Sequence, residues 1–268
     1  MNDRAASDRI VVTPFFLDRP VPRLAALADD DWGDNWIVNR PALALGGRGG
    51  DETQARMSCL HRSLAEIVAE TVARGRRPVS LCGDCCATIG VLAGLQRAGL
   101  DPTLIWFDAH GDFNTRETSP SGFLGGMPLA MLVGRGAQAM PRAVGLRPQS
   151  EDRVILSDAR DLDPGERKAL ERSSVVHVAD VARLRDMVPP EGPLYVHFDT
   201  DILTADEVPA QNYPVADGPS AELLGAVFER LAATGRVVAA SLSSWNPDLD
   251  RDRASENTCL AVYRRLLG

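Results

Sequence analysis

Asp108, His110 and Asp112 stand at alternate positions directly after an apolar run, residues 103–107. Carboxylates and imidazoles are common ligands of divalent cations. Because alternate side chains of an extended chain lie on one side, this spacing predicts that the three groups converge on one point. Open α/β sheets bind ligands beyond the carboxyl ends of their strands. The pattern therefore predicts a metal site just past a strand.

The same arrangement recurs at two further places. A second apolar run, 194–198, leads into Asp199 and Asp201, and a third, 78–82, leads into a segment containing Cys85. An isolated pair of aspartates is a common pattern, but two such clusters after separate strands favour a site for two cations with bridging carboxylates. Carboxylates packed this closely without a cation would destabilise the protein.

The chain contains five cysteines, an odd number that argues against a disulfide framework. Cys86 lies beside Cys85 and is either a small residue at a helix start or a reactive thiol. His197 shares a side of its strand with Asp199 and is interpreted as a residue that supports a ligand. The remaining cysteines and histidines are interpreted as structural: Cys59, Cys82, Cys259, His61 and His177.

Apolar runs of strand length alternate with helical patterns along the chain. The expected strands are 10–14, 78–82, 103–107, 153–157, 175–178, 194–198 and 237–242, with 42–45 as a weaker eighth. Helical spacing of apolar residues covers 60–72, 223–231 and 260–266. Near-continuously apolar strands separated by helices predict a parallel sheet covered on both faces. We expect a single α/β domain spanning residues 1–268.

Composition narrows the class of protein. A net charge of −8 over 268 residues argues against a nucleic-acid partner. No apolar run approaches the roughly 18 residues of a membrane span. The polar start of the chain lacks an apolar signal region, which predicts a cytoplasmic protein. Three glycine- and proline-rich stretches, 46–50, 119–126 and 208–218, are expected to be long loops, which are often functional.

Together these motifs resemble those of the ureohydrolase superfamily, which includes arginase, agmatinase and formiminoglutamase. Residues 82–85, 108–112 and 197–201 match its GGDH, DAHxD and SFDxD motifs in order, and 246–247 match the end of its ExNP motif. The resemblance implies a three-layer α/β/α sandwich with about eight parallel strands. It also implies two Mn²⁺ ions that activate water for attack on a guanidinium carbon, a small-molecule substrate, and a homo-oligomer, either trimer or hexamer.

Carried over by position, the resemblance implies six metal ligands: Cys85, Asp108, His110, Asp112, Asp199 and Asp201. Asp108 and Asp199 would bridge both ions. Cys85 and Asp112 would complete one site, and His110 and Asp201 the other. His110, Asp112 and Asp199 are assigned to the reacting centre.

The resemblance further implies a pocket for the amino-acid head group. Asn114 and Ser121 would hold the substrate carboxylate, and Asp163 and Glu166 would face its ammonium group, partly through water. Amide and hydroxyl donors suit a carboxylate, whereas acidic side chains suit an ammonium. The alternative for 163–166 is an ordinary helix start with acids in its first turn.

Three positions depart from the family pattern. Cys85 replaces a histidine ligand, and its soft thiolate shifts the expected preference from Mn²⁺ toward Zn²⁺ or Fe²⁺. Gly125 stands in place of the histidine proposed as a proton shuttle. Ser244 stands in place of the glutamate that pairs with the guanidinium, and binds the distal group in the predicted pocket. Since a hydroxyl cannot replace a bidentate carboxylate, we expect a less basic distal group, such as an N-hydroxyguanidine like that of hydroxyarginine.

Two other functions remain open at this point. Loss of the groups at 125 and 244 would also fit a degenerate homologue with a binding, regulatory or structural role, although the retained metal-binding side chains oppose it. Alternatively, Cys85 or Cys86 is a nucleophile, which requires a neighbouring base, and His110 is the one obvious candidate. Metal content distinguishes the first alternative from a hydrolase.

Overall fold

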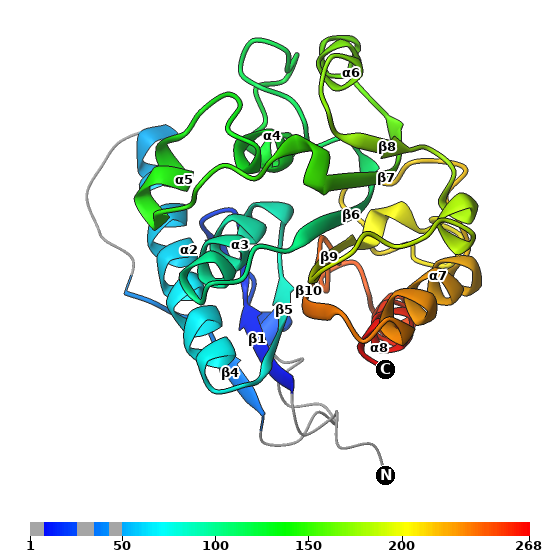
Figure 1. Cartoon of the computed structure of the whole chain (residues 1–268), viewed down its shortest axis with the longest axis horizontal. Coiled ribbons are helices and arrows are strands. Elements are labelled where there is room, and N and C mark those ends of the chain that lie inside the picture. The colour runs from blue at the N-terminus through cyan, green and yellow to red at the C-terminus, as the bar shows by residue number, and fades with distance from the viewer. Residues whose placement is uncertain (1–7, 26–34, 43–49) are drawn as a thin grey trace.

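The computed structural model describes residues 8–25, 35–42 and 50–268. Within these ranges lies a sheet of eight parallel strands in the order β4-β1-β5-β10-β9-β6-β7-β8 (Figure 1). The strands are β1 (Asp8–Thr13), β4 (Trp36–Val38), β5 (Arg77–Cys82), β6 (Thr103–His110), β7 (Val154–Asp161), β8 (Val176–Val178), β9 (Leu194–Asp199) and β10 (Val237–Ser243). The predicted parallel α/β sheet is confirmed.

All seven of the main predicted strands are present, but the weaker eighth was wrong in position. Residues 43–45 lie outside the described residues, and Ala42 belongs to no strand. The eighth strand is β4, which pairs with β1 at the edge of the sheet. Its three residues, half-buried and flanked by Asn35 and Asn39, form too short an apolar run to be distinguished from a loop.

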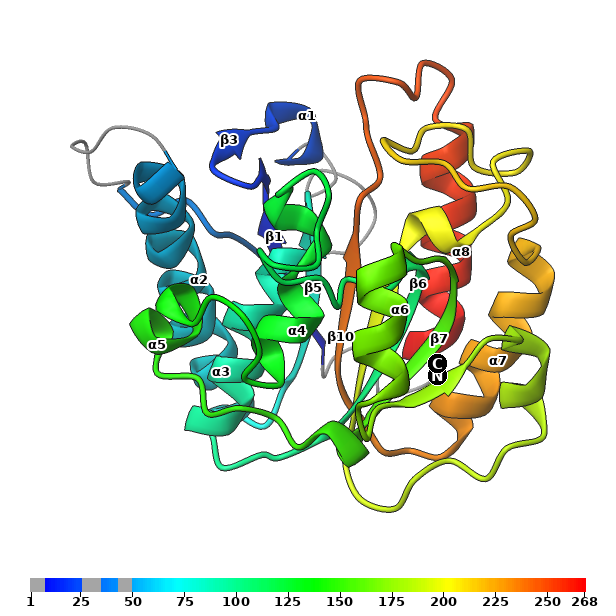
Figure 2. The same ribbon diagram turned by 90° about the horizontal axis from the view of Figure 1, so that it is seen from above.

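Helices form a layer on each face of the sheet. Figures 1 and 2 show the two helix layers on opposite sides of the sheet. The first contains α2 (Gly50–Ala73), α3 (Thr88–Arg97), α4 (Pro128–Leu132) and α5 (Ala139–Val144), and the second contains α7 (Ala221–Ala233) and α8 (Ala254–Leu267). The short helices α1 (Pro22–Ala25) and α6 (Pro164–Glu171) follow β3 and β7.

Each central strand contributes to two hydrophobic clusters. In β6, Trp106 belongs to the cluster beneath α2 and α3, whereas Phe107 belongs to the cluster beneath α7 and α8. Because successive side chains of a strand point to opposite faces, a strand covered on both sides must be apolar at nearly every position. This explains the near-continuous apolar runs of the sequence. Within the described residues, no helix is long and apolar enough to cross a bilayer.

The four central strands, in the order β5-β10-β9-β6, carry the residues predicted to do chemistry. Cys85, Ser244, Asp199 and Asp108 lie at or just beyond the carboxyl ends of these strands. Neighbouring strands lie about 4.8 Å apart. The sheet therefore brings together four segments that are far apart in the sequence.

A short hairpin, β2 (Phe15–Phe16) and β3 (Arg19–Pro20), lies against the end of β5. The backbone N–H of Leu17 donates to Asp84 Oδ2 at 2.7 Å. A Cβ atom at Gly83 would lie 2.1 Å from the carbonyl oxygen of Phe15, so this position requires glycine. The hairpin places Phe16 in the wall of the cavity that holds the predicted site.

Candidate active site

A carboxylate stabilises the turn that follows each of three central strands. Asp108 Oδ1 accepts the N–H of His110 at 2.7 Å, and Asp199 Oδ1 accepts the N–H of Asp201 at 2.9 Å. Asp84 Oδ1 makes the same contact at 2.9 Å with the N–H two residues further on. Aspartate commonly holds a tight turn in this way. The loops that carry the predicted ligands are therefore fixed at the strand ends.

The predicted convergence is present, but the predicted reason was wrong in part. A register irregularity separates Asp108 from His110, where β6 ends. Asp112 has a left-handed φ of 49°, and Asp201 lies in a 3-10 turn, Thr200–Ile202. Alternation within β6 therefore accounts for Asp108 and His110, whereas tight turns place Asp112 and Asp201.

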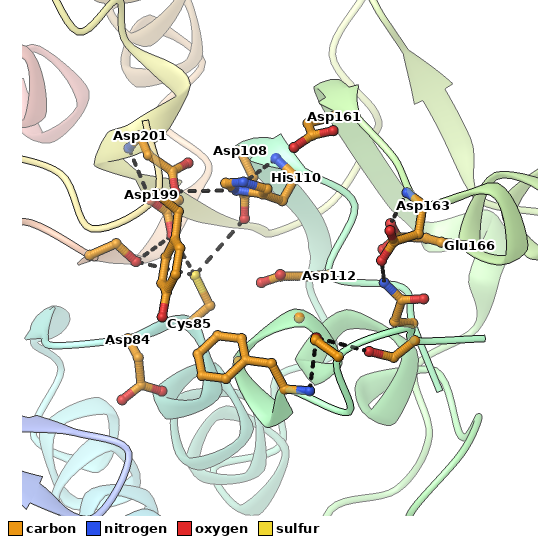
Figure 3. A pocket seen from close by; sticks show the side chains of 18 of the residues that line it. Asp84, Cys85, Asp108, His110, Asp112, Asp161, Asp163, Glu166, Asp199 and Asp201 are labelled. Carbon is orange, nitrogen blue, oxygen red and sulfur yellow. Dashed lines mark hydrogen bonds and ion pairs between the residues drawn. The ribbon is translucent and has the colours of Figure 1, made fainter. Parts of the chain in front are cut away.

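Three trios of donor atoms lie close together within the described residues, and two of them share Asp108. Atoms of Asp108, His110 and Asp201 lie within 4.8 Å of one another, and so do atoms of Cys85, Asp108 and Asp112 and of Cys85, His197 and Asp199. Figure 3 shows the side chains of the six predicted ligands around a common space. All six line a single cavity.

Asp199 lies against the Cys85 side of this cluster. Its Oδ2 is 2.6 Å from Cys85 Sγ. The hydroxyl groups of Ser243 and Ser244, at the end of β10, donate to the same oxygen at 3.3 and 2.5 Å. Ser243 Oγ is also 3.2 Å from the Cys85 sulfur. The side of the cavity predicted to lack the guanidinium partner is thus occupied by two hydroxyl groups.

Burial and the crowding of like charges disfavour ionisation of the cluster. Burial, followed by the charges of neighbouring aspartates, raises the pKa of Asp112 and Asp199 well above the usual range. The same causes raise the pKa of Asp201 to about 6. Burial lowers the pKa of His110, but the hydrogen bonds that its ring donates to Asp108 and Asp201 outweigh burial and raise that pKa to about 12. The cluster is therefore short of positive charge.

Two buried carboxylate oxygens without a hydrogen-bond partner among the described residues indicate that a cation would supply the missing positive charge. Asp112 Oδ2 and Asp201 Oδ1 are buried and make no hydrogen bond within the described residues. Unpartnered buried carboxylates destabilise a protein unless a cation neutralises them. A set of carboxylate, imidazole and thiolate donors matches the ligand preferences of divalent transition metals. These residues fit a divalent metal centre.

The metal-free protein should lose stability as the pH rises from about 4.5 to about 7.5. Burial is the leading cause that raises the pKa of Asp201 to about 6 and that of Glu166 to about 7. Because these carboxyls bind more protons in the folded than in the unfolded state across this window, rising pH favours unfolding. We expect a fall on the order of 3 kcal/mol in urea titrations of chelated protein.

Adding Mn²⁺ or Zn²⁺ at the upper end of this range should restore stability, because a ligand that binds the folded state stabilises it. Chelated protein whose stability rises between the same two pH values would contradict this proton balance.

The four residues predicted to bind the head group all line the same cavity. Asn114 Nδ2 donates to Asp163 Oδ2 at 3.0 Å. Glu166 accepts the backbone N–H groups of Phe113 at 2.8 Å and of Asp163 at 3.2 Å. Asp163 is the N-cap of α6, so the helix-start interpretation also holds. Ser121 lies in the exposed loop on the same side.

The profile of the Arginase family matches residues 32–268 of this chain. The chain belongs to the arginase family. It is 31% identical over 220 residues to the arginase of Bacillus subtilis (strain 168), covering 78% of this chain and 74% of that one. It is 29% identical over 257 residues to the N(omega)-hydroxy-L-arginine amidinohydrolase of Streptomyces lavendulae, covering 94% and 83%. The arginase structure from Bacillus caldovelox aligns with a TM-score of 0.81 at 26% identity, covering 97% of each chain.

Membership of the arginase family confirms the predicted ureohydrolase resemblance and its α/β fold. The chain is a hydrolase of the arginase type, which argues against a purely structural role. The structure also gives no support to a thiol nucleophile. Burial and the charge of Asp199 raise the pKa of the Cys85 thiol, and His110 directs its Nδ1 at Asp108 and Asp201.

Three aromatic side chains that the sequence analysis missed line the cavity of this arginase-family chain: Phe16, Phe123 and Tyr213. The ring of Phe123 lies 6.4 Å from that of Phe16 and 5.5 Å from that of Tyr213. Phe123 and Tyr213 lie in the glycine- and proline-rich stretches predicted to be functional loops. No sequence pattern predicted that Phe16 lines the cavity, because its position depends on the hairpin that follows β1.

The loop that carries Tyr213 is fixed to the rest of the fold. Gln211 Nε2 donates to the carbonyl oxygens of Thr200 and Leu203, both at 3.1 Å. Arg160 donates to the carbonyl oxygen of Val215 at 2.9 Å. These contacts hold Tyr213 beside the ligands rather than leaving it on an unanchored loop.

Gly125 lies directly against the ring of Phe123. A Cβ atom there would lie 2.3 Å from the Phe123 ring. Phe123 therefore occupies the space that the family histidine would need. Any side chain at position 125 therefore requires the Phe123 ring to move.

Proposed function

We propose that this arginase-type hydrolase cleaves the amidino group of an amino acid whose distal group is less basic than a guanidinium. An N-hydroxyguanidine, as in N-hydroxy-L-arginine, is the leading candidate. The observation that carries this proposal is Ser244, whose hydroxyl donates to Asp199 at 2.5 Å instead of offering a carboxylate to the substrate. A charged guanidinium is recognised best by a bidentate carboxylate. Similarity to the Streptomyces amidinohydrolase over 94% of the chain supports the same substrate class.

We further propose that the site binds two divalent cations. Mn²⁺ is the leading candidate, and Zn²⁺ or Fe²⁺ is the alternative because a thiolate ligand shifts the preference toward them. They would be held by the six residues that line the cavity: Cys85, Asp108, His110, Asp112, Asp199 and Asp201. Asp108 belongs to two of the three donor trios, which suits a bridging role. When bound, such ions lower the pKa of water and stabilise charge that develops on the reacting group.

The remaining residues orient the substrate in this proposal. Asn114 and Ser121 bind its carboxylate, and Asp163 binds its ammonium group. Both oxygens of Glu166 are engaged by backbone N–H groups, so Glu166 holds the loop of Asn114 and acts on the ammonium group only at longer range. The distal group then points toward Asp199, across the cavity from Asp163 (Figure 3), and toward the Ser244 hydroxyl that contacts Asp199.

The remaining sequence-based expectations are kept as proposals. The chain acts as one domain spanning residues 1–268, which is supported by two hydrophobic clusters that flank one sheet. It is cytoplasmic and forms a homo-oligomer, trimer or hexamer. Its net charge of −8 supports a small-molecule substrate over nucleic acid.

Metal content and substrate preference test the proposed function together. We expect about two metal equivalents per chain after purification without chelators. At equal metal loading, kcat/KM for N-hydroxy-L-arginine, measured as ornithine release, should exceed that for L-arginine by about tenfold or more. Equal or faster turnover of L-arginine would reject the substrate class. No bound metal after incubation with Mn²⁺, Zn²⁺ or Fe²⁺ would reject the metal-dependent mechanism, and a single equivalent would point to Cys85 as the altered ligand.

Gly125→His should impair this enzyme instead of restoring a proton shuttle. Because Phe123 fills the space beside Gly125, the new side chain must displace the aromatic wall. We expect kcat/KM for the preferred substrate to fall about tenfold or more. Phe123→Ala combined with Gly125→His should recover part of this loss, with Phe123→Ala alone as the control. Wild-type kinetics in Gly125→His would show that the loop accommodates the side chain.

A further inference from the structure

Four buried polar side chains form a hydrogen-bonded chain behind Cys85. The hydroxyls of Tyr195 and Ser241 lie 2.8 Å apart, and Ser241 Oγ lies 2.8 Å from His197 Nδ1. His197 Nε2 lies 3.4 Å from Ser243 Oγ. All four residues are at most 1% exposed. The proposed mechanism above gives them no role.

The direction of these hydrogen bonds follows from the buried phenol. Tyr195 can donate its proton only to Ser241 among the contacts within the described residues. The Ser241 hydroxyl must then donate to His197 Nδ1, so the ring hydrogen of His197 lies on Nε2. The reverse direction would leave the phenol proton buried without an acceptor, which is more unfavourable than an ordinary hydrogen bond is favourable.

The chain ends on a donor that faces the metal centre. Ser243 accepts from His197 Nε2 and therefore keeps its own proton for donation. In this structure its single proton is donated to Asp199 Oδ2 at 3.3 Å, and Cys85 Sγ, 3.2 Å away, is the second acceptor within reach of the same hydroxyl. Both of these acceptors carry negative charge when they bind a metal. The other side of the His197 ring is fixed, since the ring of Trp106 packs against it with centroids 4.0 Å apart.

We propose that His197 and Ser243 are a positioning pair that directs a hydrogen bond at the Cys85 thiolate and withdraws charge from it. The inference rests on the metal centre proposed above. A thiolate donates more charge than the imidazole it replaces and so weakens the Lewis acidity of its metal. Hydrogen bonds to a ligand sulfur counteract this donation.

Cobalt-loaded holoprotein provides the test, because a thiolate bound to Co²⁺ gives a charge-transfer absorption band. Ser243→Ala removes the donor and should shift this band to longer wavelength. It should also lower kcat about tenfold or more, with little change in KM. His197→Leu should produce the same shift. His197→Gln retains an N–H near the Nε2 position and should keep the band near its wild-type position.

Cys85→His supplies the matched background, since it removes the thiolate that the pair would serve. There, Ser243→Ala should lower kcat by a clearly smaller factor than it does in the wild-type background, because only the hydrogen bond to Asp199 remains to be lost. An equally large loss in that background, or an unmoved band in both Ser243→Ala and His197→Leu, would overturn the inference. Cobalt binding without a thiolate band would overturn it while leaving the hydrolase proposal standing. Failure to bind cobalt or any other divalent metal would refute both.

Discussion

His110→Ala is expected to remove one metal ion per chain and to slow hydrolysis by about 10³-fold or more. His110 Nδ1 lies 3.3 Å from Asp108 Oδ1 and 3.2 Å from Asp201 Oδ2. Alanine removes the one nitrogen donor of this trio and leaves two carboxylates facing each other. Elemental analysis of the purified variant, with rates measured at fixed metal concentration, checks both parts of the prediction.

His177→Ala is the matched control for this variant. His177 lies in β8, with an exposed side chain whose Nε2 contacts only the carbonyl oxygen of Asp158 among the interactions described for it. Metal content and rate should stay near those of the wild type. Full metal content in His110→Ala would show that the ligand assignment is wrong.

Ser244→Glu is expected to shift substrate preference toward arginine. The new carboxylate lies at the reacting end of the cavity, where it can pair with a charged guanidinium. We expect the ratio of kcat/KM for L-arginine to that for N-hydroxy-L-arginine to rise about tenfold or more. Ser244 is buried and its hydroxyl donates to Asp199, so losing this hydrogen bond should lower stability by about 1 kcal/mol.

Ser244→Gln separates charge from size in this experiment. Glutamine matches glutamate in shape and in backbone strain but carries no charge, so its preference should stay close to that of the wild type. The same shift in both variants would attribute the effect to added volume. No shift in either would show that the distal group does not lie beside position 244.

The fold was predictable wherever the residues of a single helix or strand form a recognisable pattern in the sequence. β6 and β9 are apolar at nearly every position because helices cover both of their faces. α3 was missed because Gly90 and Gly94 weaken its helical signal. The structure shows why glycine is needed there: a Cβ at Gly94 would lie 2.6 Å from the Ala65 carbonyl oxygen in α2.

The clustering of the candidate ligands was predictable because they follow three separate strands and the strand ends meet in any parallel sheet. The aromatic wall and the chain behind Cys85 were not, because neither is a local pattern. His197 and Ser241 are register partners on β9 and β10, separated by 44 positions along the chain. Only the pairing of the strands shows that they touch.

The β2–β3 hairpin contributes Phe16 to the cavity and no predicted ligand to the metals. One wall of the cavity is therefore built by a segment that lies outside the loops of the proposed ligands. Because Leu17 of this hairpin donates to Asp84, the same segment also holds the loop after β5 in place. A substitution in the hairpin should thus change the shape of the cavity and the position of Cys85 together.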